Sequence, residues 1–147
     1  MQKELVGGNS LMDNIIPIFH SLSKSLRGIH KSSCDVISIV QSSILYEISL
    51  INKPSMQMVA QTVGMDITTF SRQIGTLEKK ELVLRTPFEG DRRIYLLSLT
   101  EKGSDMVVAI NGIIAAKMEN ALVSMNDFER ETVLRSMHVL EVKLRGN

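Results

Sequence analysis

Apolar residues recur every three or four positions in the first third of the chain, a spacing that predicts amphipathic helices. The first helix is predicted over residues 11–30, with an apolar face of Leu11, Ile15, Ile18, Phe19, Leu22, Leu26 and Ile29. Because a proline fits best in the first turn of a helix, Pro17 predicts a regular start near Asp13 or Asn14, or a kink at the proline. A polar stretch follows, and the same spacing predicts a second helix over residues 36–51.

Capping residues in the middle of the chain predict a helix, a tight turn and another helix. Ser55 is the expected N-cap of a short helix over residues 56–63, and Gly64 is the expected left-handed residue at its end. Asp66 is the expected N-cap of a helix over residues 67–80. The apolar face of that helix consists of Ile67, Phe70, Ile74 and Leu77. Its other faces carry Thr68, Thr69, Ser71, Arg72, Gln73 and Thr76.

Beyond this helix the apolar spacing changes to every second residue, which predicts a two-stranded hairpin. The alternating residues, on either side of a polar segment, are Leu82, Leu84, Ile94, Leu96 and Ser98. Thr100 is the expected N-cap of a long helix that follows. A last helix is expected over residues 127–144, after a restart at Ser124 or Asn126.

The order of these elements predicts a mostly α fold with a small β-hairpin wing. It is a winged helix-turn-helix domain flanked by N- and C-terminal dimerisation helices. The predicted divisions are residues 1–35 for the N-terminal dimerisation helix, 36–100 for the DNA-binding domain and 101–147 for the C-terminal dimerisation helices. In so small a chain the wide apolar surfaces of residues 11–30 and 104–145 would find few partners, so we expect a homodimer.

The charge of the chain limits how it could bind a nucleic acid. Its 17 Lys and Arg stand against 16 Asp and Glu, a formal net charge of +1, which excludes a polybasic protein that binds by bulk attraction. Residues 66–103 hold seven basic and six acidic side chains. Any affinity for DNA must therefore come from geometry and from the doubled contacts of a dimer, and it should depend strongly on salt.

Two segments of the central region resemble the MarR family of bacterial transcriptional regulators. DITTFSRQIGTLEKKELVLR (66–85) is similar to the recognition helix, and DRRIYLLSLTEKG (91–103) to the wing and the start of the next helix. The wing pattern DxRxxxLxLTxxG is matched by Asp91, Arg93, Leu97, Leu99, Thr100 and Gly103. Glu81 departs from the family, which usually has glycine there. A non-glycine residue in a left-handed conformation costs roughly 1 kcal/mol, so either the helix ends differently or the strain is tolerated.

The polar face of the helix over residues 67–80 is the predicted reader of DNA. An α-helix fits the major groove, where Arg or Gln can reach guanine or adenine edges and hydroxyls can meet phosphates. Arg72 is the expected base reader. The residues predicted to bind DNA from this helix and from the start of the preceding one are Ser55, Thr68, Thr69, Ser71, Arg72 and Gln73. For Ser55, capping is the simpler role.

The wing adds Asp91, Arg92 and Arg93 to the predicted DNA-binding residues. An arginine pair on a turn is more often solvated surface, but here it follows a helix-turn-helix at wing spacing, where an arginine can enter a narrow minor groove. The residues alone leave open which arginine turns inward. The resemblance implies that Arg93 is inserted and that Asp91 orients it.

The resemblance also implies a signal, either a small aromatic ligand held between the dimer helices and the winged lobe or the oxidation of a cysteine. Cys34 is the only thiol, and neighbouring cations could lower its pKa, although a small half-buried residue is the simpler interpretation. His20 and Tyr46 are the candidates for a ligand pocket, where a local hydrogen bond is the simpler role for the tyrosine.

These patterns predict a dimeric, sequence-specific transcriptional regulator, a repressor, bound to double-stranded DNA at a pseudo-palindromic operator. The three histidines accompany no nucleophile motif, phosphate loop or zinc motif, so no enzyme activity, metal or cofactor is expected. The uncharged run 36–46 is too short and polar to span a membrane, and a single cysteine favours the cytoplasm. The alternative is a winged-helix module that binds protein and not DNA.

Overall fold

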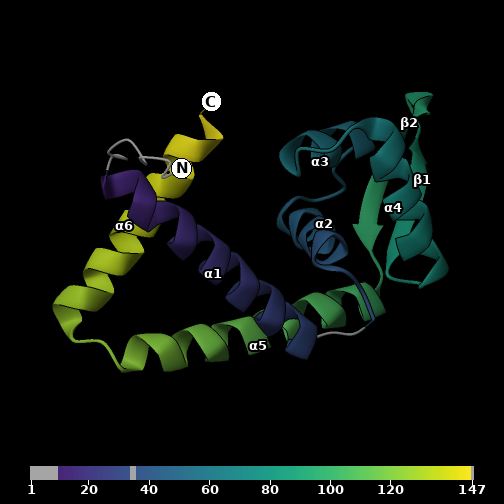
Figure 1. Ribbon diagram of the computed structural model, residues 1–147. Coiled ribbons are helices and arrows are strands. Elements are labelled where there is room, and N and C mark those ends of the chain that lie inside the picture. The colour runs from purple at the N-terminus through teal and green to yellow at the C-terminus, as the bar shows by residue number, and fades with distance from the viewer. Residues whose placement is uncertain (1–9, 34–35, 147) are drawn as a thin grey trace, which may run out of the picture. The chain divides into compact units, whose positions relative to one another are not determined.

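The computed structural model describes residues 10–33 and 36–146 (Figure 1). The described chain has six helices and a two-stranded antiparallel sheet in the predicted order. The elements are α1 (Ser10–Ser33), α2 (Ile39–Leu50), α3 (Met56–Thr62), α4 (Ile67–Lys79), β1 (Val83–Phe88), β2 (Asp91–Leu99), α5 (Glu101–Val123) and α6 (Asp127–Arg145). The predicted fold class, mostly α with a hairpin wing, is confirmed.

The chain divides into two compact units, Met1–Asn111 and Gly112–Asn147, so the boundary between them falls within α5. The core of the first unit lies where α2, α3 and α4 pack against the hairpin, as Figure 1 shows. Its largest fully buried side chains are Phe70, Ile44, Leu45, Ile74, Leu77, Leu82, Leu97, Val59 and Val83. The domain limits expected at residues 35 and 100 stay a prediction.

The predicted caps of the helix-turn-helix are present. The Ser55 hydroxyl accepts from the N–H of Met58 at 3.2 Å, and Gly64 has a φ of 67° after α3. The Asp66 carboxylate accepts from the N–H of Thr69 at 2.9 Å. Ile67 differs from expectation, since it is 45% exposed and only the other three apolar positions of α4 are buried. Its place in the first turn puts it at the rim of the core.

Of the alternating residues that predicted the hairpin, only Leu82, just before β1, is buried. Val83 pairs with Leu99 and Arg85 with Leu97, and it is Val83 and Leu97 that are buried, whereas Leu84 is 53% exposed. Apolar residues occupy both faces of these strands, so the spacing reveals a strand without revealing its inner face. The free edge of β2 also meets the segment before α3, because the N–H of Leu97 donates to the Pro54 carbonyl at 2.9 Å.

Two helix starts differ from the prediction. α1 begins at Ser10 and continues through Pro17, so the expected start near Asp13 or Asn14 is wrong, and the alternative of a kink at the proline stays a prediction. Proline has no backbone N–H, and the helix tolerates the loss of this one hydrogen-bond donor. α2 begins at Ile39, three residues later than expected, because the Ser38 side chain caps it.

The later helices begin as predicted. The Thr100 hydroxyl accepts from the N–H of Gly103 at 2.9 Å at the start of α5. Of the two expected restarts, Asn126 is the one that caps α6, in a reciprocal capping box with Glu129. None of the described residues of α6 is buried.

α5 is the one described helix long and apolar enough to cross a membrane, by length and composition alone. The helices of soluble proteins pass the same test. Val107 and Ile110, in the part of α5 that belongs to the first unit, are buried in its core. Val108, Ile113 and Val123 of the same helix are exposed.

Candidate nucleic-acid interface

The buried side chains of α4 fix which of its faces is presented to solvent. Phe70, Ile74 and Leu77 are fully buried, so the helix cannot roll about its axis. The residues on the far side are exposed: Thr68, Thr69, Arg72 and Thr76. Ser71 and Gln73 lie at the edges of that face and are half-buried. The N-terminal half of α4 thus offers hydroxyls and one guanidinium on a single polar surface.

The N-terminus of α4 is occupied by its own cap. Hydrogen bonds from Thr69, from its side chain first and its backbone N–H second, lower the pKa of the exposed Asp66 carboxyl. The carboxylate is therefore ionised at neutral pH and sits at the positive end of the helix. A phosphate at that position would meet a like charge, so the hydroxyls of the exposed face are better placed to meet phosphates than the end of the helix.

Gln73 is turned partly toward α2. Its Oε1 accepts from Nε2 of the buried Gln41 at 3.0 Å. Of the residues of α4 predicted to contact DNA, Gln73 is the one whose side chain forms a hydrogen bond with another helix.

At the tip of the hairpin, Asp91 and Arg93 form a two-point pair. Arg93 Nε donates to Asp91 Oδ1 at 3.1 Å and Nη2 donates to Oδ2 at 3.0 Å, and the Arg93 backbone N–H donates to Oδ1 at 3.0 Å. The Arg93 side chain is nevertheless 91% exposed. The guanidinium is held in one orientation and is open to a partner.

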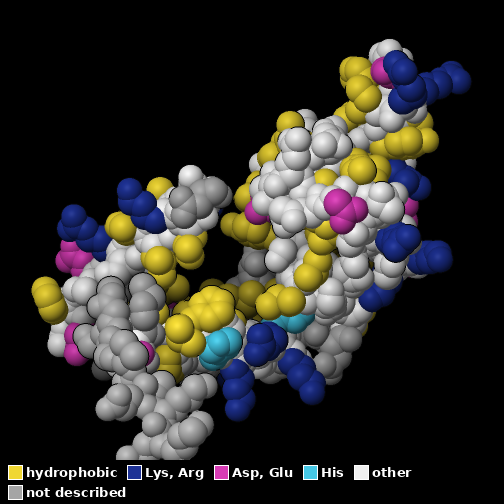
Figure 2. All heavy atoms as spheres, turned by 45° about the horizontal axis from the view of Figure 1, so that its top comes forward, with side chains coloured by type: hydrophobic (Ala, Val, Ile, Leu, Met, Phe, Trp, Pro, Cys, Tyr) yellow, Lys and Arg dark blue, Asp and Glu magenta, His cyan; other side chains and the backbone are white. Residues whose placement is uncertain are grey.

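The Arg93 side chain is also the main cause of the lowered pKa of the Asp91 carboxyl, with the backbone N–H of Arg93 second. Because the pKa is lowered, the pair is intact at neutral pH and is lost only as the pH falls through that lowered value. Figure 2 shows the basic side chains at this tip projecting beyond the rest of the surface. Arg92 is exposed and makes no hydrogen bond or ion pair within the described chain.

Arg85 ties the base of the wing to the recognition helix. Its Nη2 lies 3.3 Å from Oε2 of Glu78 on α4, and its guanidinium stacks over the ring of Tyr95 at 5.1 Å from the centroid. Sequence reasoning missed both Arg85 and Tyr95. Only the hairpin register puts them on the same face, so the one signal that could have found them is the pairing of β1 with β2.

A groove of about 540 Å³ lies between the helix-turn-helix and the hairpin. It is lined by Ser55, Met56, Gln57, Ile67, Ser71, Arg85, Arg93, Ile94 and Tyr95. Three residues predicted separately from the sequence, Ser55, Ser71 and Arg93, are thus brought together. Arg72, Thr68 and Thr69 lie on the exposed face of α4 beside this groove and do not line it.

Residues 37–95 match the model of the MarR family. Among curated proteins, the uncharacterized HTH-type transcriptional regulator YybA of Bacillus subtilis is 23% identical over 129 residues, which cover 86% of each chain. A second regulator named in the same way, YxaD of the same organism, is 32% identical over 73 residues, 50% of this chain and 51% of its own.

The central part of the chain, residues 37–95, is thus similar to the MarR family.

Solved structures of the MarR family share its fold. FabT of Streptococcus pneumoniae in complex with DNA superposes with a TM-score of 0.78 at 20% identity, over 93% of this chain and 96% of its own. MarR superposes with a TM-score of 0.76 at 16% identity, over 91% of this chain and 99% of its own. PcaV of Streptomyces coelicolor, solved with its natural ligand, superposes with a TM-score of 0.75 at 16% identity, over 92% of this chain and 97% of its own.

The departure from the MarR pattern at Glu81 is resolved in favour of strain. Glu81 has a φ of 61°, so the helix ends as a glycine would end it. Its carbonyl accepts from the Thr100 hydroxyl at 2.7 Å, and the Lys80 carbonyl accepts from Lys102 Nζ at 2.9 Å. These bonds hold the left-handed residue in place at the junction between α4 and β1.

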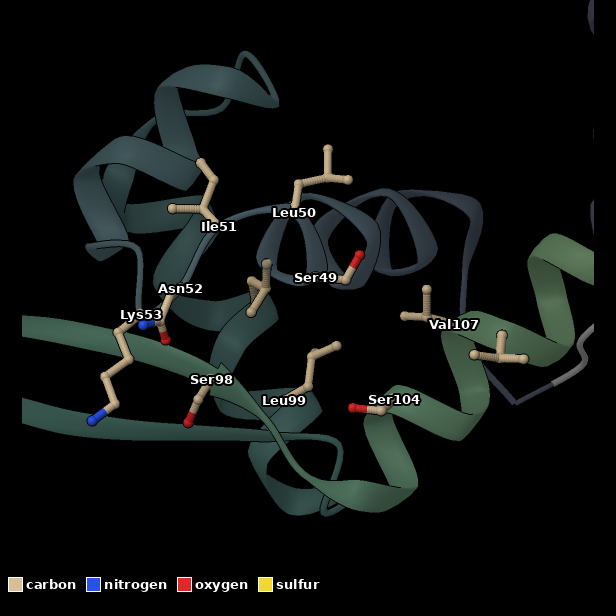
Figure 3. Close-up of a pocket in the computed structure, with 11 residues that line it drawn as sticks. Ser49, Leu50, Ile51, Asn52, Lys53, Ser98, Leu99, Ser104 and Val107 are labelled. Carbon is tan, nitrogen blue, oxygen red and sulfur yellow. The ribbon is translucent and has the colours of Figure 1, made fainter.

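Of the three residues predicted to sense a signal, the structure describes two, His20 and Tyr46. Cys34 lies outside the described residues. His20 on α1 and Tyr46 on α2 are both exposed. A pocket of about 550 Å³ between the end of α2, the end of β2 and the start of α5 is lined by neither. Figure 3 shows Leu99 and Ser104 pointing into this pocket, while the Lys53 side chain extends away from it across the strands.

Proposed function

We propose that this regulator binds a pseudo-palindromic DNA site as a homodimer, with the exposed face of α4 in the major groove and the hairpin tip in the adjacent minor groove. The observation that carries the proposal is the Asp91–Arg93 pair, which holds an exposed guanidinium at the tip of the wing. A narrow minor groove has a strong negative potential that attracts such an arginine. The fold likeness to FabT, solved with DNA, supports this placement.

The roles within the site follow from exposure. Arg72, exposed on α4, is the base reader, and Thr68, Thr69 and Ser71 contact the phosphates. Ser55 caps α3 and lines the same groove as Arg93, so it contributes to DNA binding by shaping that groove. Arg92 adds charge beside the inserted Arg93, and Asp91 orients it. Because the acidic side chains nearly balance the basic ones, the binding is selective by shape and symmetry and is sensitive to salt.

The dimer supplies the second half-site contact. Large apolar side chains are exposed along α1, α5 and α6, and exposed apolar surface of this kind marks a site of protein association. A second copy of the chain covers them through a two-fold interface, which also matches the symmetry of the operator. Bound in this way in the cytoplasm, the dimer blocks transcription and acts as a repressor.

Release of the DNA requires a signal that changes the distance between the two recognition helices. The candidates are a small aromatic effector and the oxidation of Cys34. The pocket at the end of α2 joins the recognition domain to the start of α5, so a ligand there would act on both.

A fluorescence-anisotropy titration with fragments of the DNA upstream of the protein's own gene, at two salt concentrations, tests the proposal. Arg93→Ala should weaken binding to all sites, by about tenfold or more, and should reduce the salt dependence. Arg72→Ala should also relax the base preference. Asp91→Asn should weaken binding although it removes a negative charge, because the guanidinium loses its two-point partner.

Arg135→Ala, which removes an exposed arginine of α6, is the control with the same change in charge as the arginine variants. Equal affinity of the Arg93→Ala variant and the wild type would reject the wing assignment. Addition of peroxide to the bound complex, with Cys34→Ser as its control, tests the redox signal. No binding at low salt by an intact dimer would favour the alternative, a module that binds protein, which the near-neutral charge of residues 66–103 allows.

A further inference from the structure

The buried side-chain amide of Gln41 is fixed in orientation by the start of its own helix. The backbone N–H of Ser38 donates to Gln41 Oε1 at 3.3 Å, and the Ser38 hydroxyl accepts from the Gln41 backbone N–H at 3.2 Å. A backbone N–H can only donate, so the group that faces it must be the oxygen of the amide. The Nε2 of Gln41 is therefore directed away from the cap.

The orientation of Gln41 determines that of Gln73 on the recognition helix. Gln41 Nε2 can only donate, and it donates to Gln73 Oε1 at 3.0 Å. The oxygen of Gln73 is thus engaged with α2, and its Nε2, with two N–H groups, has no acceptor among the described residues. Gln73 is half-buried at the edge of the exposed face of α4, next to Arg72.

We infer that Gln41 is a positioning residue for base recognition, which makes Gln73 a donor and not an acceptor toward the major groove. This inference rests on the proposed function, in which α4 occupies that groove. A glutamine that is free to turn can bond adenine with both its oxygen and its nitrogen, accepting from N6 and donating to N7. With its oxygen held by Gln41, Gln73 presents only N–H groups. Guanine, with acceptors at both O6 and N7, fits two donors, whereas the N4 amino group of cytosine does not.

The variant Gln41→Glu tests this inference by reversing the polarity of the link. A glutamate at this position keeps the volume and still accepts from the Ser38 N–H, as the usual partner in a capping box. Its carboxylate can only accept, so Gln73 must turn its Nε2 inward and its Oε1 toward the DNA. The preference at one symmetric pair of operator positions should move from guanine toward cytosine or adenine, by roughly tenfold in relative affinity.

The measurement is the relative affinity for all four bases at each operator position, by competition binding of the full-length protein. Gln61→Glu, an exposed amide-to-carboxylate change on α3, is the matched control. Both variants add a negative charge and should weaken binding to every sequence, but only Gln41→Glu should change the preference. In a Gln73→Ala background, Gln41→Glu should leave the preference unchanged, which separates positioning from a loss of packing.

If Gln41→Glu does not fold, Gln41→Met removes the link at similar volume and should loosen the preference at the same positions. An unchanged preference in the folded Gln41 variant, or in Gln73→Ala alone, would overturn the inference while leaving DNA binding itself intact. A wild-type protein that binds no DNA would overturn the proposed function together with this inference.

Discussion

At the residue scale, Glu81 shows how a single position stores strain at a junction. The chain must turn sharply between α4 and β1, and the N–H of Leu82 donates to the Leu77 carbonyl at 3.0 Å as a result. That closure needs a left-handed residue, which glycine adopts at no steric cost. Glu81 adopts it with a φ of 61°, and its side chain gains only an exposed contact with Lys102 at 3.4 Å. An exposed ion pair of this kind contributes little to stability.

We therefore expect Glu81→Gly to increase the free energy of unfolding by about 0.5–1 kcal/mol. Relief of the left-handed strain, about 1–2 kcal/mol, exceeds the backbone entropy that glycine loses on folding, about 0.5–1 kcal/mol. Urea denaturation at neutral pH measures the difference. Glu81→Ala, which removes the Lys102 contact but keeps the strain, should not be stabilised, and equal stabilisation of both variants would contradict this account.

At the scale of elements, the first turn of α5 crosses the start of the hairpin at van der Waals distance. The N–H of Thr100 donates to the Leu82 carbonyl at 3.1 Å. One turn on, a Cβ at Gly103 would lie 2.0 Å from that same carbonyl oxygen. The close approach of two backbones, and not a turn, is the reason for glycine at this position. The Gly in the wing pattern thus sets the distance between α5 and the DNA-binding domain.

Gly103→Ala should accordingly lower the free energy of unfolding by about 1–3 kcal/mol, the usual range for overpacking. Thermal and urea unfolding of the purified protein report it. Gly75→Ala on α4 is the matched control, since a Cβ there meets nothing within 4 Å. Alanine in that open helical position should instead stabilise by up to about 1 kcal/mol. Similar effects of the two substitutions would argue against a crossing this tight.

At the scale of the whole molecule, the charge and the exposed apolar surface lead to the same conclusion. The net charge of +1 gives no general attraction for DNA, so we expect the affinity of the proposed dimer to come from the combined contacts of two recognition helices and two wings. The second unit, Gly112–Asn147, has no buried residue in α6, and Leu140 is 52% exposed there. We expect a helix pair of this kind to be stable only against further apolar surface, which a second copy of the chain would supply.

Leu140→Glu should convert the dimer to a monomer at micromolar concentration and abolish binding to the operator. Burial of one leucine is worth about 1.5–3 kcal/mol and counts twice in a two-fold interface, so the dimer dissociation constant should rise about a hundredfold or more. Light scattering coupled to gel filtration gives the mass. His138→Glu adds the same charge two residues earlier, on the other side of α6, and should remain dimeric. A Leu140→Glu protein that stays a dimer would move the interface elsewhere.

The sequence by itself determined the local features of this protein. The caps Ser55, Asp66, Thr100 and Asn126 act on neighbours three residues away, so the residue types suffice to predict them. The wing pattern from Asp91 to Gly103 was likewise readable, since residues two apart on a hairpin tip form their pair without help from the rest of the fold.

Tertiary structure decided everything that depends on contacts between distant segments. The buried face of the hairpin follows from strand register, and so does the stacking of Arg85 on Tyr95. The orientation of Gln73 depends on Gln41, a residue 32 positions earlier in the chain. The spacing of apolar residues cannot predict such pairs. It shows which residues of one element share a face, but not which side chain of another element packs against that face.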